Sequence, residues 1–236
     1  MKTILNALGF LVPVVILPIL VVSQLIAMNS RSRESIKRNT DSTTLHIIKD
    51  SLSCKGDSTK GKTVLYIGDS HTSYMYGWQD QLSKLTGMVT TTLAKGGMRT
   101  DWMLRNSRHM FAKKFDYCVI WGGANDAASM YSLDSSISNI QRMIDLGRKN
   151  GTKMIVLTGF DPKVVKITES NRGQWGFYPP RYVTLQSKMK KGLRGALVVQ
   201  NWYVSRQDGD CGDFICHMSA SGHRKMAVGI YNEVFK

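Results

Sequence analysis

Acidic residues are scarce in this chain: its 236 residues include 17 Asp and Glu against 32 Lys and Arg, for a formal net charge of +15. Such an excess favours an anionic partner (phospholipid headgroups, an acidic glycan or nucleic acid), although solubility and charge beside a membrane would explain it equally well. The sequence also lacks a zinc-finger pattern, an aromatic RNA-binding motif and a Walker loop. We therefore expect no nucleic-acid partner.

Cysteines are also few, and no two of the four have CxxC spacing. That absence disfavours a structural zinc site, and metal-binding carboxylates paired at a convincing spacing are missing too, which disfavours a metal-dependent nuclease or phosphodiesterase. Cys118 lies in an apolar run and is expected to be a buried thiol. Cys211 and Cys216 flank a short loop and could form a disulfide in an oxidising compartment.

Residues 4–28 carry no charge and are dominated by Leu, Ile and Val. At 1.5 Å per residue, this run is long enough to span the roughly 30 Å hydrocarbon core of a bilayer. We predict a transmembrane anchor or uncleaved signal over residues 1–30, followed by a polar tether over residues 31–61. A cleaved signal peptide is the alternative, but its apolar region is usually only about 7–15 residues long.

The orientation of this single-pass segment is ambiguous. Four basic residues within 31–38 follow the apolar run, and the positive-inside rule would place the large domain in the cytoplasm. The possible Cys211–Cys216 pair and the envelope substrates considered below favour the opposite side. We expect the soluble domain on the periplasmic or extracellular side of the membrane.

Residues 62–236 alternate between short strand-like runs and helical periodicity, which predicts one α/β domain. Its expected architecture is a three-layer α/β/α sandwich around a five-stranded parallel sheet. The segment Gly159–Pro180 is expected to be a long irregular connection. The strand-like runs are Thr63–Ile67, Met88–Ala94, Phe115–Trp121, Lys153–Thr158 and Ala196–Gln200.

Four polar clusters follow these runs or precede the last helix. The carboxyl ends of parallel strands meet at one edge of a sheet, where ligands bind in open α/β folds. That edge would hold a serine, glycine amides, an asparagine and a histidine, which together can perform acyl transfer. Each cluster alone is ordinary turn or capping chemistry. The clusters are Gly68-Asp69-Ser70, Gly96-Gly97, Gly123-Ala124-Asn125-Asp126 and His217.

These clusters resemble, in order, the four conserved blocks of the SGNH (GDSL-like) hydrolases, over about residues 62–230. The resemblance implies a flavodoxin-like sheet and a serine esterase that needs no metal or cofactor. It implies Ser70 as the nucleophile and His217 as the general base. The backbone N–H groups of Ser70 and Gly97 and the side-chain amide of Asn125 would form the oxyanion hole.

The acid departs from the family pattern. The family places it three residues before the histidine, where this chain has Phe214, and Asp213 lies four residues before His217. A one-residue bulge, held by a Cys211–Cys216 bridge, could bring Asp213 to the imidazole as the third catalytic residue. The alternative is a Ser-His dyad whose ring is oriented by a backbone carbonyl.

The leading hypothesis is a membrane-anchored esterase that hydrolyses or transfers a small acyl group, O-acetyl in particular, on an envelope glycan or lipid. Lysophospholipase or thioesterase activity is an alternative, and so is a catalytically silent module that binds an acidic glycan. Among neighbouring residues, Asp69 is expected to hold its turn and His71 to shape the pocket. His223 is expected on the helix surface. The oligomeric state is not predicted.

Overall fold

The computed structural model describes residues 53–236, which form one α/β unit around a five-stranded sheet. Every strand pair is parallel, and the strand order is β2-β1-β3-β4-β5. This confirms the predicted α/β class and parallel sheet, with each strand within two residues of its expected bounds. The strands are β1 (Thr63–Gly68), β2 (Val89–Ala94), β3 (Tyr117–Trp121), β4 (Lys153–Leu157) and β5 (Leu197–Val199).

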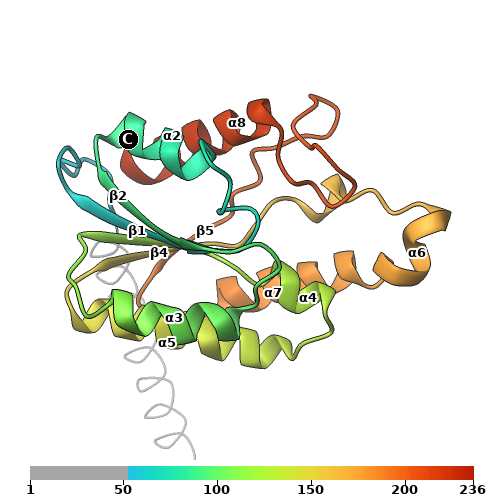
Figure 1. Cartoon of the computed structure of the whole chain (residues 1–236), viewed down its shortest axis with the longest axis horizontal. Helices are drawn as coiled ribbons and strands as arrows, with labels where there is room; N and C mark the ends of the chain where they lie inside the picture. The colour runs from blue at the N-terminus through green and yellow to red at the C-terminus, as the bar shows by residue number, and fades with distance from the viewer. Residues whose placement is uncertain (1–52) are drawn as a thin grey trace, which may run out of the picture. The chain divides into compact units, whose positions relative to one another are not determined.

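Helices cover both faces of the sheet, as the connections between parallel strands require (Figure 1). One layer contains α2 (Trp78–Thr86) and α8 (Ala220–Ile230), which contact each other, and α8 continues into a π-helical turn, η2 (Tyr231–Phe235). The opposite layer contains the contacting pairs α3–α5 and α4–α7. Its helices are α3 (Thr100–Met110), α4 (Ala124–Ala128), α5 (Leu133–Lys149) and α7 (Tyr178–Gly192).

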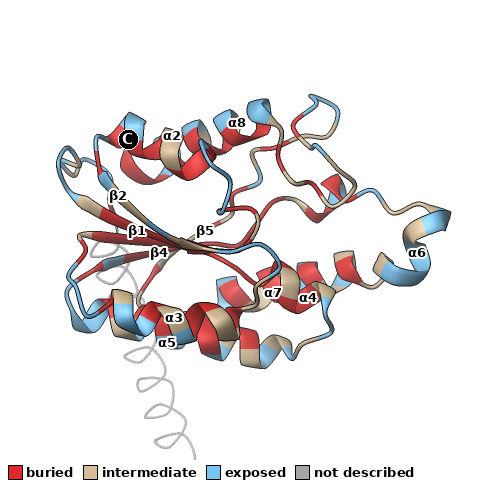
Figure 2. Ribbon diagram, viewed as in Figure 1, coloured by how far each residue is buried: buried red, intermediate tan, exposed pale blue. Residues whose placement is uncertain are grey.

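The central strands are buried between these layers, as Figure 2 shows. All five residues of β3 are buried, and so are the last five of β1. Runs of Val, Ile and Leu suit such positions because a strand covered on both faces has no polar side. The edge strand β2 is polar in comparison, with Thr residues at three of its six positions and no fully buried residue.

The expected irregular connection over Gly159–Pro180 is wrong. This segment contains the 3-10 turn η1 (Pro162–Val164), helix α6 (Glu169–Trp175) and the first residues of α7. The prolines of this segment are compatible with helical structure because they lie in first turns, where the missing N–H would have no helical partner. Pro162 begins η1 after the Asp161 side chain accepts the Lys163 N–H, and Pro179 lies in the first turn of α7.

The predicted anchor over residues 1–30 and most of the predicted tether over 31–61 lie outside the described residues. Within 53–236, no helix is both long and apolar enough to cross a membrane. The described end of the tether packs on the domain: Cys54 is buried, and the Asp57 carboxylate accepts from the Tyr117 hydroxyl at 2.7 Å and from Lys153 Nζ at 2.6 Å.

Candidate active site

Ser70 lies two residues after the end of β1, in a tight turn. The turn depends on Gly68, where an added Cβ would lie 2.3 Å from Thr72 Oγ1 and 2.9 Å from the Trp121 carbonyl oxygen. The buried Asp69 carboxylate then accepts the His71 N–H at 3.0 Å, as expected of a residue that holds its turn. The serine is left half-buried at the carboxyl edge of the sheet.

The structure brings the three predicted catalytic side chains together. His217 Nε2 lies 2.9 Å from Ser70 Oγ, although the two residues are 147 positions apart in the chain. The other ring nitrogen, Nδ1, lies 2.5 Å from Asp213 Oδ2, and the His217 N–H donates to Asp213 Oδ1 at 2.8 Å. This is the geometry of a serine-histidine-acid relay, and the acid reaches the ring despite its shifted position.

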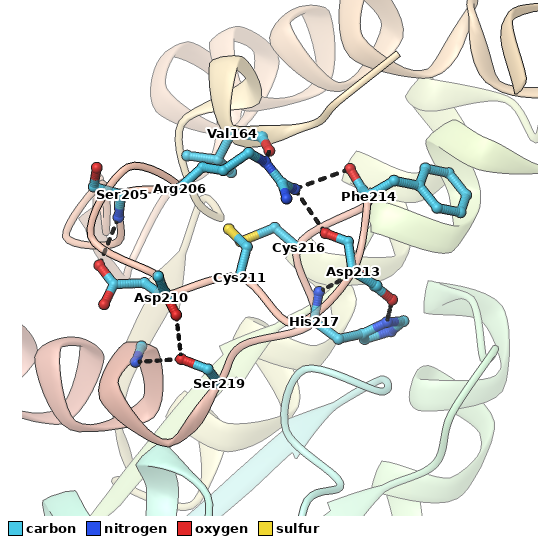
Figure 3. Close-up of a disulfide and its surroundings, with 12 residues drawn as sticks. Val164, Ser205, Arg206, Asp210, Cys211, Asp213, Phe214, Cys216, His217 and Ser219 are labelled. Atoms are coloured by element: carbon cyan, nitrogen blue, oxygen red, sulfur yellow. Dashed lines mark hydrogen bonds and ion pairs between the residues drawn. A yellow bond between two sulfur atoms is a disulfide. The ribbon is translucent and has the colours of Figure 1, made fainter. Parts of the chain in front are cut away.

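The extra residue between acid and histidine is taken up in a closed loop (Figure 3). A disulfide joins Cys211 to Cys216 with a Cα–Cα distance of 4.5 Å. Cys216 has a φ of +64° and donates its N–H to the Asp213 carbonyl at 3.2 Å. Gly212 N–H donates to the His217 carbonyl at 2.6 Å, so backbone contacts close the loop beside the bridge.

Arg206, which is not among the residues predicted from the sequence, fixes the same loop to the rest of the domain (Figure 3). Its Nη2 donates to the Asp213 carbonyl at 2.7 Å and to the Phe214 carbonyl at 3.2 Å. Its Nε donates to the Val164 carbonyl at 2.7 Å, which ties the loop to η1. No sequence pattern could have identified this residue, because it binds backbone oxygens rather than a matching side chain.

The local environment favours the ionised form of Asp213. Burial alone would raise its pKa, but hydrogen bonds from the side chain and backbone of His217 hold the pKa below its usual value. An ionised carboxylate at this position fixes the orientation of the ring and stabilises the imidazolium that forms when His217 takes a proton.

The other two predicted oxyanion-hole residues, Gly97 and Asn125, lie close to the turn that carries Ser70. A Cβ added to Gly96 would lie 3.8 Å from the Ser70 Cβ, which places the Gly96-Gly97 turn beside the serine. Gly97 has a φ of +74° and lines one cavity together with Asn125. The Asn125 amide donates to Asp69 Oδ2 at 3.3 Å and to the Met98 carbonyl at 3.1 Å, so it also holds the glycine turn in place.

Asp126, next to Asn125, links three helices that pack beside the Gly96-Gly97 turn. Its buried carboxylate accepts from the Thr100 N–H at 3.0 Å, from the Thr100 hydroxyl at 2.5 Å and from the Ser136 hydroxyl at 2.8 Å. Helix capping is the alternative role for Asn125-Asp126, but the N-cap of α4 is Gly123, which makes no side-chain hydrogen bond. Asp126 instead joins α4 to the first residues of α3 and α5.

Two further histidines lie near the relay. His71 is buried, its Nδ1 lies 3.0 Å from Asp69 Oδ1, and its ring stacks on that of His217 with centroids 5.1 Å apart. The prediction that His223 lies on the helix surface is wrong: it is 6% exposed, and its Nδ1 accepts the Trp78 N–H at 3.2 Å. Burial and the neighbouring His71 lower the pKa of His223. Helical spacing alone did not reveal that α2 covers this position.

Two expectations for the cysteines agree with the structure. Cys118 is fully buried, as predicted, and Cys211 and Cys216 are paired. Within residues 53–236, no group of three or more His, Cys, Asp or Glu side chains is placed to hold a metal ion.

Comparison with known proteins gives one family. The model of the GDSL-like lipase/acylhydrolase family matches residues 54–225. No curated protein matches the chain.

Three solved structures with the same fold share 15–18% sequence identity with the chain. A protein from Slackia heliotrinireducens, classed as an SGNH hydrolase, has a TM-score of 0.61 over 73% of this chain and 98% of its own. A GDSL-like lipase from Bacteroides thetaiotaomicron has a TM-score of 0.59 over 73% and 87%. A catalytic mutant of Axe2, an acetylxylan esterase from Geobacillus stearothermophilus, has a TM-score of 0.56 over 74% and 94%.

Proposed function

Because the chain belongs to the GDSL-like lipase/acylhydrolase family, we propose that it is a serine esterase that removes a small acyl group, acetyl in particular, from a glycan. The observation that carries the proposal is the hydrogen-bonded series Ser70–His217–Asp213 at the carboxyl edge of the sheet. The acetylxylan esterase with the same fold also supports it, since its catalytic mutants replace a serine, an aspartate and a histidine.

The reaction would proceed through an acyl-enzyme. Ser70 Oγ attacks the acyl carbonyl carbon while His217 Nε2 takes the hydroxyl proton, and Asp213 stabilises the resulting imidazolium. The tetrahedral intermediate collapses, the ester C–O bond breaks, and His217 gives its proton to the leaving sugar hydroxyl. A water molecule then attacks the acyl-serine, with His217 again as the base, which releases acetate and restores Ser70.

The negative charge on the carbonyl oxygen would be stabilised by the N–H groups of Ser70 and Gly97 and by the Asn125 amide. One such donor is typically worth about 3 kcal/mol in the transition state. Asn125 would exchange its bond to the Met98 carbonyl for a bond to the oxyanion, while its bond to Asp69 keeps the amide in place. Asp69 therefore acts as a positioning residue for the oxyanion hole.

Hydrolysis of p-nitrophenyl acetate by the full-length protein tests this function. We expect Ser70→Ala and His217→Ala to lose at least about 10³-fold in kcat, as removal of a nucleophile or its base does in serine hydrolases. His109→Ala is the matched control, because His109 is an exposed histidine near the end of α3. Equal rates in the wild-type, Ser70→Ala and His217→Ala proteins would contradict the proposal. Labelling of Ser70 by an organophosphonate would exclude a catalytically silent binding module.

We further propose that residues 4–28 anchor the protein in a membrane and that the domain faces the periplasm or the cell exterior. The Cys211–Cys216 bridge supports this side, because disulfides persist in oxidising compartments. Protease treatment of intact cells, with lysed cells as the control, tests the orientation. Digestion of the domain only after lysis would place it in the cytoplasm or behind an outer barrier. Permeabilising the outer envelope alone distinguishes these two locations, because the protease then reaches a periplasmic domain but not a cytoplasmic one.

A further inference from the structure

A cavity of about 440 Å³ lies beside the candidate oxyanion hole and shares Gly97 and Asn125 with it. Its remaining walls come from the first turns of α3, from α4 and from Trp175 at the end of α6. The volume is within the range of about 300–1,000 Å³ that is usual for small-molecule sites. An acetyl group would fill little of it, so the cavity has room for the alcohol part of the ester.

The cavity wall carries more positive than negative charge, with Arg99 and Arg105 against Asp101. Arg99 Nε lies 3.4 Å from Asp101 Oδ1, and Arg105 Nη1 lies 3.5 Å from Asp101 Oδ2, so two guanidinium groups share one carboxylate. The Arg99 side chain is 39% exposed and that of Arg105 is 67% exposed. Because each guanidinium has five N–H donors, both arginines retain donors for a bound anion.

Arg99 is also held in place before any ligand arrives. Its guanidinium carbon lies 4.7 Å from the centroid of the Tyr131 ring, in a cation–π contact. The backbone of the adjacent Thr100 is fixed by Asp126. An arginine oriented in this way loses less side-chain freedom when it binds an anion, which favours recognition over a merely solvated charge.

Two tryptophans complete the wall. Trp102 and Trp175 are half-buried and line the cavity. The Trp175 ring packs edge-on against Phe214, with centroids 5.5 Å apart, and therefore contacts the loop that carries Asp213. Flat indole faces beside fixed polar groups suit a sugar ring, which has apolar faces and polar edges. A long alkyl chain is disfavoured in this cavity, because it would have to lie against two arginines and an aspartate and would remove them from water.

We propose that this cavity binds an anionic sugar, so that the substrate is an acylated glycan with a carboxylate or phosphate on the acylated residue or its neighbour. This inference rests on the esterase function proposed above, and it identifies the alcohol part of the ester. Arg99 and Arg105 bind the anion, Trp102 and Trp175 contact the sugar, and the acyl carbonyl reaches Ser70 through the shared Gly97–Asn125 wall.

The test compares acetylated sugars that differ in charge. Full-length protein is given mono-O-acetyl regioisomer mixtures of methyl glucuronide, of methyl glucoside 6-phosphate and of methyl glucoside. We expect kcat/KM for at least one anionic sugar to exceed that for the neutral sugar by about tenfold or more. Arg99→Gln should lower this preference about tenfold and the more exposed Arg105→Gln about threefold. Comparison of kcat/KM for the acetylated glucuronide and the acetylated 6-phosphate shows whether a carboxylate or a phosphate is preferred.

Arg108→Gln is the matched control, because Arg108 is exposed on the same helix but does not line this cavity. It should leave the preference unchanged, and added NaCl should reduce the preference of the wild-type protein. Equal kcat/KM for all three sugars, or a preference that survives both Arg99→Gln and Arg105→Gln, would overturn the inference.

The esterase proposal can fail separately. If the wild-type protein hydrolyses neither these sugars nor p-nitrophenyl acetate, calorimetric titration of the Ser70→Ala protein with a glucuronate oligosaccharide still tests the cavity. Binding that is weakened by Arg99→Gln would support the anion site in a protein that is not an esterase. Binding unaffected by Arg99→Gln would reject it.

Discussion

Removal of the Cys211–Cys216 bridge should reduce activity without abolishing it. The bridge encloses Asp213 and lies next to His217, so it restricts the residues that hold the acid against the ring. The backbone hydrogen bond from Gly212 to the His217 carbonyl and the three hydrogen bonds from Arg206 do not depend on the sulfur atoms. We therefore expect the Cys211→Ser/Cys216→Ser protein to retain a partly ordered relay.

The size of the effect follows from the length of the loop. Closing a loop of about six residues restricts a flexible chain by about 2 kcal/mol. If removal of the bridge released all of this freedom in the folded protein, the fraction of molecules with a formed Asp213–His217 bond would fall by about 30-fold. This is an upper limit on the loss of kcat/KM, because the other contacts of the loop remain. Loss of the acid itself is worth about 10⁴-fold in serine proteases.

The assay is hydrolysis of p-nitrophenyl acetate by the wild-type and double-serine proteins, with and without dithiothreitol. Reductant should lower kcat/KM of the wild-type protein to that of the variant and leave the variant unchanged. Measuring the double-serine protein with and without dithiothreitol controls for effects of the reductant on the buried thiols Cys54 and Cys118. Full activity of the double-serine protein, or a loss as large as that of Asp213→Asn, would refute the reasoning.

Three other substitutions test the relay and its supports. Asp213→Asn should lower kcat by about 10⁴-fold with little change in KM, because the ring of His217 then loses its ionised acceptor; a loss below about tenfold would favour a Ser-His dyad. Asp126→Ala should lower the free energy of unfolding in urea by about 3 kcal/mol, since it leaves buried donors unpaired. His223 has a lowered pKa, so the unfolded chain binds its proton first and stability falls as the pH drops below about 6.5. In His223→Asn, urea unfolding should lose this component of the pH dependence, and an unchanged profile would contradict the burial of His223 against Trp78.

The fold and the placement of the relay could be predicted because they depend on local pattern and topology. Short runs rich in Val and Ile marked the buried strands, and the end of each run marked the carboxyl edge of the sheet. Parallel pairing then required Ser70, Gly97 and Asn125 to meet at one edge. The roles of these residues in catalysis stay predictions until the variants are measured.

Features that depend on contacts between distant segments could not be predicted. His223 has ordinary surface spacing on α8, and only the packing of α2 against α8 buries it. Arg206 looks like one of many basic residues, and it gains its position because three carbonyl oxygens converge on its guanidinium. The segment Gly159–Pro180 was predicted to be irregular, but it contains η1, the short helix α6 and the start of α7, none of which has a long periodic apolar pattern.

Asp213 contacts His217 even though it lies four residues, rather than three, before the histidine. The family pattern that the sequence resembles holds the acid three residues before the histidine, and a fourth residue would normally move the carboxylate away from the ring. Here the added residue is accommodated by the left-handed Cys216, which is covalently held by Cys211. Arg206 then binds the Asp213 carbonyl, so that the side chain is aimed at His217 from a fixed backbone. Because the disulfide and the arginine hold the same loop, their effects should couple: Arg206→Gln should reduce kcat/KM more in the reduced protein than in the oxidised one.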